Sequence, residues 1–143
     1  MIKNPIFKII SIVSVITGAI FGIIALLPLI SFGVFIVLMF FLAPFMIIYF
    51  KHLNLIENLE IEQGILYGAI SGFTGFLGFS IMFFPLAFLI DLIFKTETFL
   101  WVKVICQNFL FIAGTVFFTA LLCSLMNAFT GFMTSYIYQY FKK

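Results

Sequence analysis

The stretch GILYGAISGFTGFLG, residues 64–78, contains five of the protein's ten glycines within an otherwise apolar run. In water, glycine in a helix interior is about 1 kcal/mol less favourable than alanine. In a bilayer this penalty is offset, because hydrocarbon cannot hydrogen-bond an open backbone and so favours helix. Small residues also let two helices approach closely, which drives helix association in membranes. The stretch therefore predicts a transmembrane helix with a glycine-rich packing face.

The composition of the whole chain indicates an integral membrane protein. Of its 143 residues, 65% are hydrophobic and 8% are charged, whereas a soluble domain has about 25% charged residues. So few charges cannot cover a water-facing exterior, so the exterior must face lipid. Seven lysines, no arginine and 23 phenylalanines indicate AT-rich codons. We therefore expect a bacterial inner membrane, with an organellar inner membrane as the alternative.

Apolar runs of about 20 residues are long enough to cross a bilayer. They predict an all-α integral membrane bundle of four transmembrane helices, in a single domain over residues 1–143. The expected spans are residues 6–27, 34–50, 64–85 and 105–135, with a turn at 28–33 and a polar loop at 51–63. Pro44 should kink the second span, because proline removes a helical hydrogen bond. Residues 86–104 mix apolar and charged side chains, so we expect this segment to be interfacial or strongly tilted.

The lysines orient this bundle, because cytoplasmic loops carry an excess of basic residues. A topology with both termini in the cytoplasm (N-in/C-in) places Lys3, Lys8, Lys51, Lys142 and Lys143 inside, and Lys95 and Lys103 outside. This excess of inner lysines favours the N-in/C-in arrangement.

Small residues at helical spacing predict a packing face on two of the expected spans. Its members are Ser14, Gly18, Gly22 and Ala25 on the first span and Gly64, Gly68, Ser71, Gly72, Gly75 and Gly78 on the third. We favour packing of the first span against the third within one chain. A glycine zipper between protomers is the main alternative, and glycines flanking a bound cofactor or lipid are a further one.

Uncharged polar residues form a second pattern, which we call the polar stripe, on the last span. It consists of Asn108, Thr115, Thr119, Cys123, Asn127, Thr130 and Thr134. In hydrocarbon such side chains hydrogen-bond across helix interfaces or to a carbonyl of their own helix, and we favour this interpretation. The alternative is a face that lines a polar path or binds a substrate headgroup.

The polar loop contains an acidic cluster, formed by His52, Glu57, Glu60 and Glu62. Its spacing matches no recognised metal site, so we expect a solvated loop, or a surface for docking a partner, without a metal. The sequence also shows no nucleophile paired with a base, no phosphate-binding loop and no basic patch for nucleic acid. We therefore expect no cofactor, no nucleic-acid partner and no enzymatic activity.

These observations favour a small non-enzymatic multi-pass membrane protein. We expect an accessory or assembly subunit that packs, through its small-residue helix faces, against other membrane proteins or against copies of itself within the lipid bilayer. The alternative is a small oligomeric channel or transporter for a small solute, with the polar stripe lining the path.

Overall fold

The computed structural model describes residues 5–56, 59–95 and 98–141, and within these ranges it is all-helical, without strands. The helices are α1 (Pro5–Ile24), α2 (Pro28–Phe40), α3 (Leu42–His52), α4 (Ile61–Phe94), α5 (Leu100–Cys106) and α6 (Phe109–Phe141). This confirms the expected all-α class. Three of the helices, α1, α4 and α6, are each long and apolar enough to cross a membrane.

The second expected span is divided into two helices. Together α2 and α3 are also long and apolar enough to cross a membrane, but their axes are bent by 61° at Phe41. Pro44, in the first turn of α3, explains the break, because a proline ring clashes with the carbonyl four residues earlier and removes the N–H that would bond it. The kink expected from the sequence is therefore a full break in the helix.

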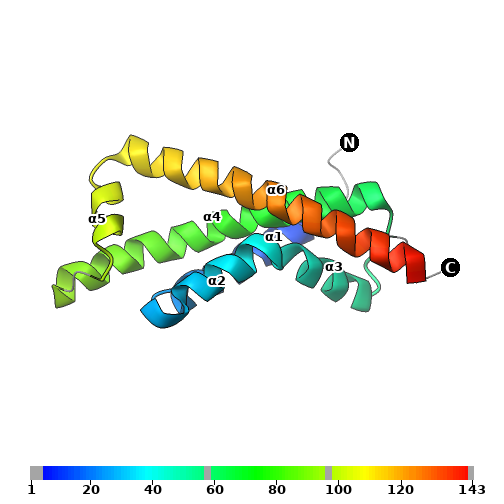
Figure 1. Cartoon of the computed structure of the whole chain (residues 1–143), viewed down its shortest axis with the longest axis horizontal. Helices are drawn as coiled ribbons and strands as arrows, with labels where there is room; N and C mark the ends of the chain where they lie inside the picture. Colours follow the sequence, from blue (N-terminus) through cyan, green and yellow to red (C-terminus); the bar gives the residue numbers. More distant parts are fainter. Residues whose placement is uncertain (1–4, 57–58, 96–97, 142–143) are drawn as a thin grey trace.

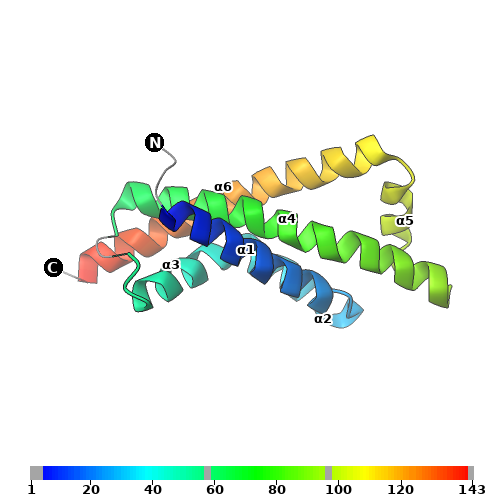
Figure 2. The same ribbon diagram turned by 180° about the vertical axis from the view of Figure 1, so that it is seen from behind.

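Helix α4 is the centre of the bundle, with α1 on one side and α6 on the other (Figures 1 and 2). Helices α1 and α4 run parallel: Phe7 packs against Tyr67 with 5.5 Å between ring centroids, and Gly22 lies beside Phe79. Helix α6 runs antiparallel to α4. The start of α1, the start of α4 and the end of α6 consequently lie at one end of the bundle.

The turn expected at residues 28–33 is wrong. The turn between α1 and α2 occupies residues 25–27, and α2 begins at Pro28. Proline is well suited to the first helical position, because the N–H that it lacks has no partner within the helix there. Pro28 is therefore the first residue of a helix and not part of a turn.

The segment around residues 86–104 does not form one structural unit. Helix α4 continues through Pro85 to Phe94, and Lys95 ends it in the left-handed conformation with a φ of 50°. A proline inside a membrane helix is tolerated where neighbouring groups satisfy the freed backbone. The short α5 then crosses the end of the bundle and packs over α4, where Val102 is fully buried. The expected last span, residues 105–135, instead begins at Phe109, after a break at residues 107–108.

Candidate functional site

The glycines of α4 pack against two different helices. Gly64, Gly68 and Gly72 face α6, where an added Cβ atom would overlap the Ser135 side chain or the backbones of Asn127 and Cys123. Such contacts bring the α4 and α6 backbones together, as small residues do between membrane helices. On α6 the contact includes Gly131, where an added Cβ would meet the Gly64 carbonyl.

The remaining glycines of the expected packing face lie between α4 and α1. A Cβ added to Gly18 would overlap the Gly75 backbone, and one added to Gly78 would overlap the Val15 backbone. A Cβ at Gly22 would lie 2.7 Å from the Phe79 carbonyl oxygen. The structure thus brings the first and third expected spans together, and the glycine row changes partner between Gly72 and Gly75.

The other small residues of this face are also buried. Ala25 lies among apolar side chains, and the Ser71 hydroxyl donates to the Gly68 carbonyl at 3.0 Å. Ser14 is fully buried in α1, and its hydroxyl has no hydrogen-bond partner within the described part of the chain. All ten residues of the expected packing face are therefore interior positions of a single chain.

Asn127, in the middle of α6, forms hydrogen bonds with backbone groups at the break between α2 and α3. Its Oδ1 accepts a hydrogen bond from the Ala43 N–H at 2.8 Å, and its Nδ2 donates to the Met39 carbonyl at 2.8 Å. In an unbroken helix Ala43 N–H would bond the Met39 carbonyl directly. The carboxamide therefore bridges the two backbone groups that the break separates. Nδ2 also lies within bonding distance of the Leu38 and Cys123 carbonyls, at 3.0 and 2.9 Å.

The other members of the polar stripe lie in different surroundings. The threonine hydroxyls donate to carbonyls of α6 itself, at distances of 2.8–3.2 Å: Thr115 to Phe111, Thr119 to Thr115, Thr130 to Asn127 and Thr134 to Thr130. Cys123 is buried against Gly72. Asn108 belongs to the start of the helix, where its Oδ1 accepts the Leu110 N–H at 3.1 Å, as N-cap residues do.

The acidic cluster is spread over the connection between α3 and α4. His52 ends α3, Glu60 immediately precedes α4 and Glu62 lies in the first turn of α4. Glu57, like Lys3, Lys142 and Lys143, lies outside the described residues. Within the described ranges, no three His, Cys, Asp or Glu side chains are grouped as metal ligands.

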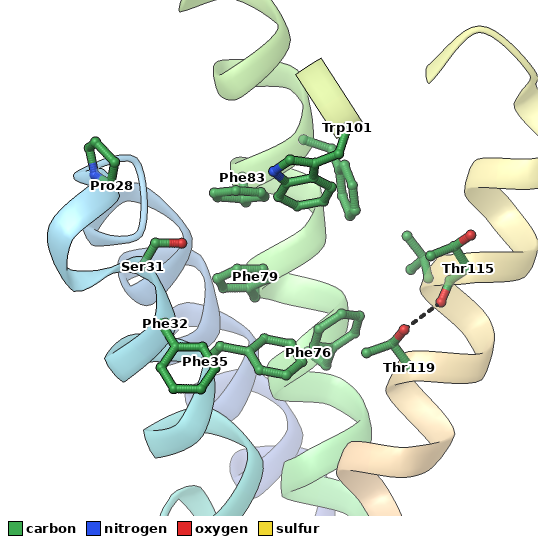
Figure 3. Close-up of a pocket in the computed structure, with 12 residues that line it drawn as sticks. Pro28, Ser31, Phe32, Phe35, Phe76, Phe79, Phe83, Trp101, Thr115 and Thr119 are labelled. Carbon is green, nitrogen blue, oxygen red and sulfur yellow. Dashed lines mark hydrogen bonds between the residues drawn. The ribbon is translucent and has the colours of Figure 1, made fainter. Parts of the chain in front are cut away.

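A pocket of about 420 Å³ lies between α2, α4, α5 and α6 (Figure 3). It is lined by Pro28, Ser31, Phe32, Phe35, Phe76, Phe79, Phe83, Phe84, Trp101, Thr115, Val116 and Thr119. Helices α2 and α6 form opposite walls, and the phenylalanines of α4 form the floor between them. No lining residue is ionisable in the physiological range, so the pocket offers an uncharged, aromatic surface.

Stacked aromatic rings order this floor. The ring centroids of Phe76 and Phe79 are 5.6 Å apart and those of Phe79 and Phe83 are 5.0 Å apart, with nearly parallel planes. Spacings of three and four residues place these side chains on one helix face. Trp101 of α5 extends the stack, 5.8 Å from Phe83. We call Phe76, Phe79, Phe83 and Trp101 the aromatic column.

Only Thr115 and Thr119 of this pocket were singled out from the sequence, as members of the polar stripe. The aromatic floor was missed, although Phe76, Phe79 and Phe83 carry a helical spacing that could have indicated it. Sequence reasoning also missed the small residues of α6 that face α4, which are Ser124, Ala128, Gly131 and Ser135. Their spacing of four, three and four residues was a visible signal.

Comparisons of this chain with protein-family models, with curated proteins and with solved structures find no match.

Proposed function

We propose that the chain spans the membrane four times, with both termini on the cytoplasmic side. The parallel packing of α1 and α4 supports this topology. Two parallel spans cross the bilayer in the same direction, so the chain between them has to return to its starting side. The α2–α3 pair is the segment available for that return, as one broken span. Lys8 and Lys51 then lie on the cytoplasmic side, in agreement with the basic-residue rule.

We further propose that the protein is a non-enzymatic accessory subunit that acts on other components of the membrane. The main support is that little of the described chain lies outside its helices. The connections between helices are residues 25–27, Phe41, 53–56 with 59–60, Lys95 with 98–99, and 107–108. Large apolar side chains such as Phe32, Leu110 and Phe118 are exposed on the helices. The surface available for contacts therefore suits lipid and other membrane helices.

The packing of the glycines refines this proposal. Their faces are covered within the chain, so a partner has to dock on other surfaces. The polar stripe also supports a subunit more than a channel, because its threonine hydroxyls bond their own helix and Asn127 is fully buried. A water-filled path would need polar side chains that point into its lumen and are free to hydrogen-bond water.

Purification in a mild detergent followed by native mass spectrometry tests the accessory role. We expect a complex with a different membrane protein in a fixed ratio, and no solute flux after reconstitution into liposomes. A homo-oligomer without a partner, whose solute flux is altered by Thr119→Val, would contradict the proposal. Thr119→Val suits this test because it removes a hydroxyl from the stripe and leaves the α2–α3 break intact.

A further inference from the structure

We propose that the pocket between α2 and α6 binds one alkyl chain of a membrane lipid along the aromatic column. This inference rests on the proposed insertion of the bundle into a membrane and does not depend on the accessory role. It starts from three properties of the pocket: its volume, its lack of charge and the order of its floor.

The volume of the pocket, about 420 Å³, fits a single lipid chain. A methylene group takes about the same volume as a water molecule, roughly 30 Å³. The pocket therefore holds a little over a dozen methylene groups, which is the scale of one lipid chain.

The lining chemistry selects an uncharged hydrocarbon. Ligand pockets are mostly apolar with a few oriented polar groups, and the polar side-chain groups here are three hydroxyls and the indole N–H of Trp101. The hydroxyls of Thr115 and Thr119 donate to carbonyls of α6, each at 2.8 Å. Their hydrogens are thus engaged, and the pocket has no cation to hold a phosphate or carboxylate at this depth. The charged part of a bound lipid has to stay outside the pocket.

The walls are positioned before any ligand arrives. Phe79 and Phe83 are buried and stacked on each other, and Phe76 packs edge-on against Phe35 of α2 with 6.2 Å between centroids. An aromatic floor that is already ordered loses little side-chain entropy when it takes up a ligand. The space between α2 and α6 therefore forms a preformed slot along which an extended chain can lie, with Trp101 at one end.

Trp101 gives a direct measurement, because it is the protein's single tryptophan and it lines the pocket. Bromine atoms on a lipid chain quench tryptophan fluorescence at contact. The protein in a non-brominated detergent would be titrated with a dibrominated phosphatidylcholine and, separately, with a brominated fatty acid. We expect saturable quenching with one site per protein. The comparison of the two probes distinguishes a two-chain lipid from a free fatty acid as the source of the chain.

Thr119→Phe places a ring in the pocket and should weaken binding roughly tenfold or more, because it fills the space that the chain needs. Leu122→Phe is the matched control on the same helix. Leu122 is 51% exposed and does not line the pocket, so the affinity of this variant for the brominated lipid should stay unchanged. Ser31→Phe tests the same prediction from the α2 wall if Thr119→Phe fails to fold by circular dichroism.

Quenching that rises linearly without saturation, and equally in wild type and both filled variants, would overturn the inference. That result indicates bulk lipid around Trp101 and no bound chain. It would leave the four-span topology and the partner complex untouched, because those are measured by labelling and by mass spectrometry.

Discussion

Gly18 of α1 and Gly75 of α4 lie backbone against backbone, with no room for a methyl group at Gly18. Three residues before Gly75, Gly72 is in the same kind of contact with Cys123 of α6. Within the described residues the backbones of α1 and α6 do not approach each other, and both helices pack mainly against α4. The stability of the protein therefore depends on close contact along two sides of one helix.

The glycine contacts predict a graded response to added volume. Gly18→Ala and Gly68→Ala should each destabilise the fold by about 1–3 kcal/mol, because the new methyl meets backbone that cannot move aside. Gly75→Ala should be milder, since its methyl meets the terminal Cδ2 of the Leu42 side chain, which can shift more easily than backbone. Thermal unfolding in detergent, followed by circular dichroism, measures the order.

Gly33→Ala and Gly114→Ala are the matched controls for that series. Both glycines lie in helices with nothing within 4 Å of an added Cβ. Removing glycine from an open helical site stabilises by about 0.4–1 kcal/mol. Equal losses of stability at all the tested glycines would contradict the backbone contacts described here.

Replacing Asn127 should loosen the α2–α3 break. Asn127→Leu leaves the Ala43 N–H and the Met39 carbonyl without their partner, and an unsatisfied buried group costs about 1–3 kcal/mol. Thr134→Val is the control, because the Thr134 hydroxyl bonds only within its own helix. Hydrogen exchange at residues 38–43 should accelerate in the first variant. Unchanged exchange in Asn127→Leu would show that the break is held by other contacts.

Two serines at helix interfaces should respond differently to alanine. The Ser124 hydroxyl donates to the Ala69 carbonyl of α4 at 2.9 Å, so Ser124→Ala should lower stability by about 0.6 kcal/mol. Ser14→Ala removes a buried hydroxyl that has no partner, so stability should stay level or rise. Chemical denaturation of both variants measures the difference, and a larger loss for Ser14→Ala would refute this account.

Four spans require the connections at Asn54 and Thr98 to lie on opposite sides of the membrane. Single cysteines at these exposed positions, in a Cys106→Ser and Cys123→Ala background, can be labelled from either side with a membrane-impermeant thiol reagent. We expect Asn54→Cys to react from the cytoplasmic side and Thr98→Cys from the outer side. The reverse pattern, with Asn54→Cys reacting from the outer side and Thr98→Cys from the cytoplasmic side, would contradict the N-in/C-in four-span topology and is the pattern expected if α2 and α3 form a re-entrant loop.

The helical class and the membrane-like character of the helices could be predicted from composition and run length alone. Helix ends were harder to predict, because Pro28 and Pro85 each have two outcomes. A proline starts a helix when it occupies the first turn and is tolerated within one when neighbouring groups satisfy the backbone. Periodicity in one segment does not reveal which case holds.

The contacts between helices could be predicted less well. The spacing of the α4 glycines indicates a smooth face, but it contains no information on where that face changes its partner from α6 to α1. Asn127 and Pro44 were each unusual in the sequence, yet their connection depends on the relative register of helices more than 80 residues apart. Among 23 phenylalanines, composition cannot distinguish those that line a pocket from those that face lipid.

The central position of α4 has a consequence for the biogenesis of the protein. Helix α1 is synthesised first, but its principal contact, the Gly75–Gly78 face of α4, lies more than 50 residues later in the chain. At roughly 5–20 residues per second, several seconds separate the synthesis of the two surfaces. During this interval the Gly18–Gly22 face is available to lipid or to the insertion machinery. A nascent chain stalled before Ile61 should therefore crosslink from Gly18 to those neighbours, and a chain stalled after α4 has emerged should crosslink to α4.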